Sequence, residues 1–84
     1  MPEITVYSKS TCPYCHAAKA LLNKKGAAFT EIDLTGDPEG QRAMAVRAGR
    51  STVPQIFIGG KHIGGCDDLH ALDAAGGLDP LLKA

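Results

Sequence analysis

Two cysteines separated by two residues, Cys12 and Cys15, are the side chains best suited to chemistry in this chain. They follow an apolar run over residues 4–7 and precede a helical pattern from His16 to Lys25, which predicts a strand-to-helix turn. Pro13 has a fixed φ and no N–H group, so it suits the first helical position. The unpaired N–H groups and the positive end of the helix dipole would then lie near Cys12 and stabilise its thiolate.

The spacing of the two cysteines predicts a redox-active pair. Cys15 falls one helical turn after Cys12 on the same face, where Cβ atoms are roughly 5–6 Å apart. That separation is slightly wide for a disulfide, so a small local adjustment would close the bridge. We therefore interpret Cys12 as an exposed attacking sulfur and Cys15 as a more covered resolving sulfur.

Composition limits the class of protein. The 84 residues predict one domain, 1–84, with a modest core. Nine basic and nine acidic residues balance, so neither a nucleic acid nor an anionic membrane is an expected partner. No apolar run approaches membrane-spanning length and no signal peptide is expected. An odd count of three cysteines argues against a secreted disulfide framework. A single C-x-x-C pair without a leader favours a reducing compartment, the cytoplasm.

The first half of the chain must position the dithiol. A short β-branched and aromatic run over residues 3–8 predicts a buried strand, and residues 9–11 form the loop that presents Cys12. The helix from Pro13 should end at Gly26, and residues 28–34 predict a second strand anchored by Phe29 and Ile32. Strand, helix and strand in so short a span predict a crossover between two parallel strands.

The second half predicts a hairpin between two helices. One helix should begin after Asp37 and stop at Gly49. Residues 55–58 and 61–63 read as strands joined by a Gly-Gly turn. A third helix is expected from residue 66 or 67 to about residue 75, and residues 78–82 predict a short capping turn. The order β-α-β-α-β-β-α predicts an α/β fold, a small mixed sheet flanked by helices.

Three motifs together resemble one family. They are Cys12-Pro13-Tyr14-Cys15, Thr52-Val53-Pro54 and Gly64-Gly65-Cys66-Asp67-Asp68, and their order and spacing resemble a glutaredoxin of the short, dithiol bacterial type. The resemblance covers essentially the whole chain. It implies a thioredoxin-like fold with a four-stranded mixed sheet. It also implies a glutathione-dependent oxidoreductase that reduces glutathione mixed disulfides and protein disulfides.

The resemblance also assigns roles to residues. Cys12 would be the nucleophile and Cys15 the resolving thiol. Pro54 would be a cis-proline facing the dithiol, an isomer that is uncommon enough to need a reason. The reason would be to offer the backbone N–H and C=O groups of Val53 to the cysteinyl part of glutathione, as an added strand. Thr52 would either contact glutathione or hold the loop before Pro54.

The remaining parts of glutathione would find partners in the same way. Gly65, Cys66, Asp67 and Asp68 resemble the helix start that receives the γ-glutamyl end, its carboxylate on backbone N–H groups and its ammonium on an aspartate. Lys9 and Gln41 match positions that face the glycyl carboxylate. Tyr14 would flank the mixed disulfide.

An acidic sulfur suits this reaction mainly as a leaving group. A cysteine with a pKa near 8.5 is about 3% ionised at pH 7. Lowering its pKa by ~3 units raises that fraction about 30-fold, but costs ~20–30-fold in intrinsic nucleophilicity. The two effects nearly cancel, so the gain lies in rapid departure when a second glutathione attacks the mixed disulfide at Cys12.

Other interpretations of the same residues remain open. The cysteines could hold zinc with Cys66, His16 or His62, although no second C-x-x-C or His-x-His pair exists to complete four ligands. Cys66 is more often a covered small hydrophobe than a reactive group, and Asp67 or Asp68 could simply cap a helix. All three histidines, His16, His62 and His70, are expected to face solvent.

Two other functions also remain open. In a cluster-binding module, two chains would share an iron–sulfur cluster through Cys12 and glutathione, which the rigid Pro13 disfavours. In a thioredoxin-like electron donor, a reductase would reduce the dithiol directly. We expect instead a monomer without a metal or permanently bound cofactor. Glutathione would be its co-substrate, and glutathionylated or disulfide-containing proteins its partners.

Overall fold

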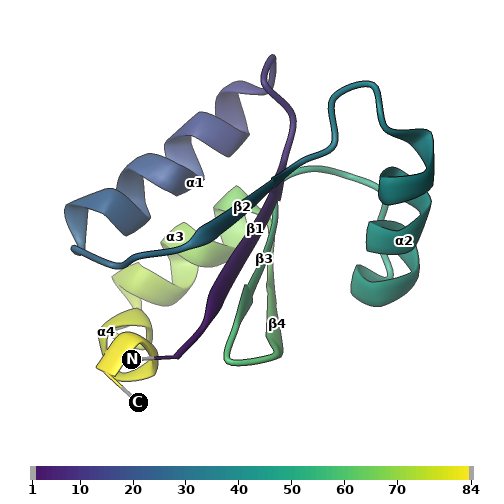
Figure 1. The fold of residues 1–84 in the computed structure, drawn as a ribbon. Coiled ribbons are helices and arrows are strands. Elements are labelled where there is room, and N and C mark those ends of the chain that lie inside the picture. The colour runs from purple at the N-terminus through teal and green to yellow at the C-terminus, as the bar shows by residue number, and fades with distance from the viewer. Residues whose placement is uncertain (1, 84) are drawn as a thin grey trace.

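The computed structural model describes residues 2–83 as one four-stranded sheet with helices on both faces (Figure 1). The elements in chain order are β1 (Ile4–Ser8), α1 (Pro13–Lys24), β2 (Thr30–Asp33), α2 (Pro38–Ala48), β3 (Gln55–Ile58), β4 (Lys61–Gly64), α3 (Cys66–Ala74) and α4 (Leu78–Lys83). This is the predicted order with one helix added at the end.

The sheet has the strand order β2-β1-β3-β4. β1 pairs in parallel with β2, placing Val6 opposite Glu31, as the strand–helix–strand pattern predicts. The other two pairings are antiparallel, with Val6 opposite Ile56 across β1 and β3. This mixed, four-stranded sheet is the thioredoxin-like arrangement that the resemblance implied.

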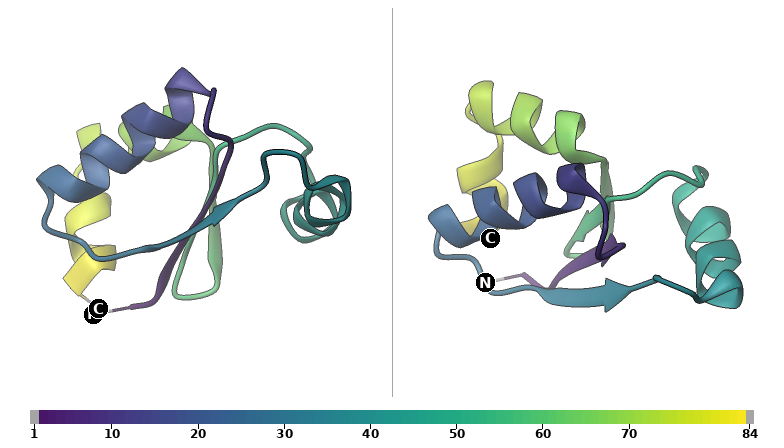
Figure 2. Two further views of the ribbon diagram at one scale, coloured as in Figure 1. Left: turned by 45° about the horizontal axis from the view of Figure 1, so that its top comes forward. Right: turned by 90° about the horizontal axis from the view of Figure 1, so that it is seen from above.

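The main core lies between the sheet and α1, α3 and α4, which cover the same face (Figure 2). The predicted stripe of α1 is the buried one: Cys15, Ala18, Leu21 and Leu22. Alternate residues of β1 and β3 meet it from the sheet, because successive strand side chains point to opposite faces. These sheet residues are Ile4, Val6, Ile56 and Ile58.

The other face of the sheet is covered by α2, which stands apart from the other three helices (Figures 1 and 2). The buried side chain of α2 is Met44. The guanidinium carbon of Arg47 lies 3.9 Å from the centroid of the Phe57 ring, and Arg47 donates a hydrogen bond of 3.0 Å to the Tyr7 hydroxyl. Arg47 therefore joins this helix to the sheet through Phe57 and Tyr7.

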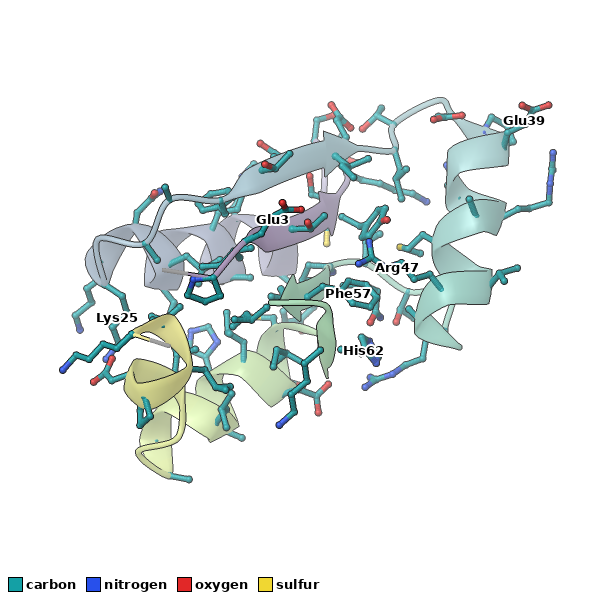
Figure 3. All side chains as sticks on the ribbon, turned by 60° about the horizontal axis from the view of Figure 1, so that its bottom comes forward. Glu3, Lys25, Glu39, Arg47, Phe57 and His62 are labelled. Carbon is teal, nitrogen blue, oxygen red and sulfur yellow. The ribbon has the colours of Figure 1, made fainter. Side chains whose placement is uncertain are left out.

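His62 belongs to this face, and the prediction that it faces solvent is wrong. The ring is half-buried, its centroid lies 5.0 Å from that of Phe57, and its Nε2 atom lies 2.7 Å from Gln55 Oε1. Figure 3 shows Arg47, Phe57 and His62 gathered between α2 and the sheet. Strand pairing places His62 on β4 directly opposite Phe57 on β3, on the same face of the sheet.

Helix starts and turns follow the local rules. Asp37 accepts a hydrogen bond of 3.0 Å from the N–H of Gly40 and so caps α2, and Gly49 ends that helix with a positive φ of 72°. The β3–β4 turn places Gly59 and Gly60 at φ 58° and 83°, the left-handed values that a two-residue hairpin turn requires.

Two boundaries differ from the prediction. β2 is an edge strand of only four residues, and Phe29 lies just before it, packed against the core. The segment expected as a capping turn is the six-residue helix α4, whose Leu78 and Leu82 are buried in the core. Burial of these two leucines stabilises a helix too short to form by itself.

Candidate functional site

The dithiol lies where the sequence predicts, at the junction of the β1–α1 loop and α1. Cys12 is the N-cap residue of α1, with extended backbone, and Pro13 is the first helical residue. The N–H groups of Cys15 and His16 donate hydrogen bonds of 3.1 and 3.3 Å to the carbonyl of Cys12. Cys12 is partly exposed and Cys15 fully buried, and both are free thiols.

The presenting loop is held at both ends. The N–H of Ser10 donates a hydrogen bond of 2.9 Å to Thr35 Oγ1, and the carbonyl of Ser10 lies 2.9 Å from His16 Nε2. The N–H of Cys12 donates to the carbonyl of Lys9 at 3.2 Å, closing a turn. These contacts hold the Cys12 backbone before any substrate arrives.

The pKa values of the Cys12 and Cys15 thiols shift in opposite directions. Partial burial opposes ionisation of Cys12, but hydrogen bonds from the Cys15 thiol and from the N–H groups of Cys15 and Tyr14, with the charge of Lys9, together lower its pKa. Burial raises the pKa of Cys15 to about 11, and the neighbouring Cys12 sulfur adds to this effect. At neutral pH the attacking form is therefore concentrated on the accessible sulfur.

The loop before β3 faces this sulfur. The Val53–Pro54 peptide bond is cis, as expected, and Pro54 is buried. The Cys12 thiol donates a weak hydrogen bond of 3.7 Å to the carbonyl of Val53. A backbone edge thus lies directly beside the nucleophile.

The start of α3 forms the next part of the site. Asp68 accepts a hydrogen bond of 2.9 Å from the N–H of Gly65. It also forms an ion pair with Arg50, in which the carboxylate oxygen lies 3.1 Å from the guanidinium nitrogen. The bond to Gly65 and the ion pair with Arg50 lower the pKa of the Asp68 carboxyl. Asp68 therefore caps the helix, one of the two roles weighed from the sequence.

Cys66, the first residue of α3, is buried, with its Sγ atom 3.3 Å from His70 Nδ1. Burial raises the pKa of the Cys66 thiol, and the charge of Asp67 and the Cys12 sulfur act in the same direction. This environment is that of a covered, unreactive cysteine, the alternative weighed for it from the sequence.

These parts line a hollow of about 180 Å³, and one of its lining residues, Val53, contacts the Cys12 thiol. Most of the residues that the resemblance assigned to glutathione line it, together with an arginine that the sequence reasoning missed. The lining residues are Tyr14, Arg50, Thr52, Val53, Pro54, Gly65, Cys66, Asp67 and Asp68.

Two assigned residues, Lys9 and Gln41, are not among the lining residues. Lys9 is half-buried at the start of the dithiol loop, and Gln41 donates a hydrogen bond of 2.9 Å to the carbonyl of Leu34. Arg50 could have been suspected from its place between the end of α2 and the Thr52-Val53-Pro54 motif. Its pairing with Asp68 joins residues 18 positions apart and has no local sequence signal.

Neither a cluster of metal-binding side chains nor a membrane-spanning helix occurs within residues 2–83. Across residues 2–83, no three histidine, cysteine or acidic side chains gather as a metal site would require. None of the helices in this range has the length and apolar character needed to cross a membrane.

Comparison with known proteins gives one consistent answer. A family model described as glutaredoxin matches residues 4–63. Glutaredoxin 3 of Escherichia coli K12 is 60% identical over 83 residues, which span 99% of this chain and 100% of that protein. A glutaredoxin of Pseudomonas aeruginosa is 55% identical over 84 residues, covering 100% of both chains.

Solved structures agree. The crystal structure of a buckwheat glutaredoxin–glutathione complex superposes with a TM-score of 0.90 at 40% identity, covering 98% of this chain and 77% of the buckwheat chain. The solution structure of glutaredoxin from Brucella melitensis gives 0.88 at 55% identity, covering 99% and 90%.

Proposed function

Because the chain belongs to the glutaredoxin family and is therefore a glutathione-dependent thiol–disulfide oxidoreductase, we propose which of its residues carry each step of that reaction. The Cys12 thiolate attacks the glutathione sulfur of a mixed disulfide. The Cys12–glutathione bond forms, the substrate disulfide breaks, and the substrate leaves as a thiolate. A second glutathione thiolate then attacks the bound glutathione sulfur, releasing oxidised glutathione and the Cys12 thiolate.

A second route serves disulfides between or within proteins. Cys12 first forms a mixed disulfide with the substrate protein. Cys15 then loses its proton and attacks the Cys12 sulfur, which releases the reduced protein and leaves a Cys12–Cys15 disulfide. Two glutathione molecules reduce that disulfide and become oxidised glutathione.

The observation that carries the proposal is that the pKa values of Cys12 and Cys15 shift in opposite directions, while Cys12 contacts Val53 at the edge of the hollow. The partly exposed Cys12 has a lowered pKa, while burial raises the Cys15 pKa to about 11. A low-pKa sulfur is the better leaving group in thiol–disulfide exchange. Cys12 is thus suited to accept glutathione and to release it again, while Cys15 stays protonated until a mixed disulfide needs resolving.

Glutathione is proposed to lie in the hollow with its cysteinyl part paired to the backbone of Val53 and its disulfide flanked by Tyr14. The γ-glutamyl end would meet the start of α3. Its carboxylate would bind the backbone N–H groups of Cys66 and Asp67, where the helix dipole is positive, and its ammonium would bind an aspartate carboxylate.

Asp67 is the better candidate for the ammonium, since Asp68 already binds Gly65 and Arg50. Lys9 and Gln41 remain the proposed contacts for the glycyl carboxylate. The amide of Gln41 has two N–H groups, so its bond to Leu34 leaves one for a ligand.

The surroundings of this activity are also proposals. We infer one domain over residues 1–84, because the core cluster draws on elements from β1 to α4. We propose that it works as a cytoplasmic monomer without a permanently bound cofactor, and that glutathionylated and disulfide-containing proteins are its partners. Light scattering of the reduced protein in the presence and absence of glutathione tests the monomer, and metal analysis of an anaerobic preparation tests the absence of a cofactor.

Single cysteine variants test the mechanism. In an assay that removes glutathione from a glutathionylated peptide, Cys12→Ser should be inactive because it has no nucleophile. Cys15→Ser should keep most activity, since the route through a second glutathione does not use Cys15. Equal loss in both variants would rule out that route.

A second measurement tests the binding mode. The Cys15→Ser variant can be trapped as the mixed disulfide of Cys12 with glutathione, because no resolving thiol remains. Pairing with glutathione should then slow hydrogen exchange of the Val53 amide relative to the reduced protein. An unchanged exchange rate would contradict the proposed pairing while leaving the cysteine roles intact.

A further inference from the structure

On the sheet face covered by α2, a chain of hydrogen bonds leads to the loop that carries Val53. The side chain of Gln55 has an exposed fraction of 0%. Its Nε2 atom donates hydrogen bonds of 3.0 Å to the carbonyl of Thr52 and 3.2 Å to the Thr52 hydroxyl. Its Oε1 atom lies 2.7 Å from His62 Nε2. The network therefore joins His62 on β4, through Gln55 on β3, to Thr52 in the loop.

The chemistry of the acceptor fixes the direction of every bond in this network. A backbone carbonyl can only accept, so the amide nitrogen of Gln55 must face Thr52 and its oxygen must face His62. The Nε2 atom of His62 must then carry a proton and donate it. The tilted contact between the His62 and Phe57 rings, with centroids 5.0 Å apart, helps to hold the imidazole in the orientation that this bond needs.

The bond to Thr52 controls the orientation of the next residue. The Thr52 carbonyl and the Val53 N–H belong to one planar trans peptide unit, in which the two groups point in opposite directions. Fixing the carbonyl toward Gln55 therefore turns the Val53 N–H away from the sheet interior. Val53 lines the hollow, and its N–H is the group proposed to pair with glutathione.

We propose that Gln55, oriented by His62, is a positioning residue for glutathione binding, acting through the Thr52–Val53 peptide. This inference rests on the proposed function, because it assumes that the Val53 backbone binds glutathione. Neither side chain lines the hollow, so each acts at one remove from the substrate. Through Gln55 and His62, packing on the sheet face beneath α2 would influence how tightly the hollow binds glutathione.

The main test replaces Gln55 by a side chain of similar length without hydrogen-bonding groups, Gln55→Met. One hydrogen bond that holds a binding group is worth about two- to tenfold in binding. The KM for a glutathionylated peptide should therefore rise about two- to tenfold, while kcat stays within about twofold. His62→Phe keeps an aromatic ring beside Phe57 but cannot donate to Gln55, so it should change KM in the same direction by a smaller factor.

A matched control separates positioning from general loss of stability. Ile58→Val removes one methylene group from the same strand, on the opposite face of the sheet, and should lower the melting temperature without changing KM. KM values equal to wild type in both Gln55→Met and His62→Phe, in folded protein, would overturn the proposal. A rise in KM that Ile58→Val reproduces would overturn it as well.

Hydrogen exchange of the Val53 amide distinguishes the positioning role of Gln55 from the proposed pairing of glutathione with Val53. The measurement compares the Cys12–glutathione mixed disulfide of Cys15→Ser with that of Cys15→Ser/Gln55→Met. Slow exchange in the first and faster exchange in the second supports positioning by Gln55. Slow exchange in both contradicts the positioning by Gln55 but leaves the pairing of glutathione with Val53 standing. Fast exchange in both shows that glutathione does not pair with Val53, so the proposed binding mode and the positioning by Gln55 both fail while the cysteine roles stand.

Discussion

The Sγ atom of Cys12 lies 3.7 Å from the carbonyl oxygen of Val53, so the nucleophile and the loop before β3 touch in the reduced protein. A thiol can donate to that oxygen, but a thiolate cannot and is repelled by its partial negative charge. Ionisation of Cys12 therefore removes this hydrogen bond. In the proposed binding mode, it frees the Val53 carbonyl to accept a hydrogen bond from glutathione at the moment when the sulfur becomes reactive.

As pH is lowered, the rate at which iodoacetamide alkylates Cys12 should fall at a pH below the ordinary pKa of cysteine. Although burial opposes ionisation, the other contacts lower the Cys12 pKa, and the rate follows the thiolate as pH falls through that value. Among the lowering contacts, the hydrogen bond from Cys15 outweighs the charge of Lys9. Cys15→Ala should thus shift the midpoint upward more than Lys9→Ala does, and the reverse order would contradict this account.

The reduced protein should lose stability as pH rises from about 9 to about 11. Burial raises the Cys15 pKa from 9.0 to about 11, so the folded state keeps a proton that the unfolded chain releases in this range. A raised pKa contributes stability below the unfolded value, and that contribution disappears as pH passes the folded value. Urea unfolding at several pH values measures it. The Cys15→Ala variant should show a smaller decline, and an identical decline would place the cause elsewhere.

Asp68→Ala and Asp37→Ala should cost similar stability but differ in their effect on glutathione. Each aspartate accepts a backbone hydrogen bond at a helix start, so each loss should cost on the order of 1 kcal/mol in the free energy of unfolding. Asp68 also lines the hollow and holds Arg50 there, and the KM for a glutathionylated peptide should rise only in its variant. Equal KM values in the two variants would remove Asp68 from the binding site.

The stability conferred by the Asp68 carboxylate should also depend on pH. Its hydrogen bond from Gly65 and its ion pair with Arg50 lower its pKa from 3.8, so its contribution is complete above that value. The contribution is lost as pH falls through the lowered pKa. The difference in unfolding free energy between wild type and Asp68→Ala should therefore shrink in acid.

Arg47→Ala should loosen α2 without unfolding the rest of the chain. It removes the guanidinium stacked on Phe57 and the hydrogen bond to Tyr7, contacts together worth about 0.5–2 kcal/mol. Amide exchange in α2 should become faster than in α1, since local opening follows the weakest packing. Val46→Ala, at a neighbouring position that is 86% exposed, should leave exchange unchanged and serves as the control. Faster exchange throughout the chain would show that α2 does not open by itself.

Local physical rules made much of the fold predictable. The stripe ending in Leu21 and Leu22, the cap at Asp37 and the turn at Gly59-Gly60 each depend on residues within a few positions of one another. The dithiol was predictable for the same reason, because a helix start after Cys12 determines which sulfur is exposed and which is buried. The resemblance to a family supplied what local rules do not reach, the cis bond before Pro54.

The tertiary structure decided which distant side chains meet. His62 looked solvent-facing in the sequence, yet β3–β4 pairing brings it to Phe57 and Gln55. Arg50 reaches Asp68 only because α3 begins beside the loop before β3. The sequence by itself determines short-range preferences, because these depend on neighbouring residues along the chain. Burial, ion pairing and polar networks depend on how sheet and helices pack, so they become known only once the chain is folded.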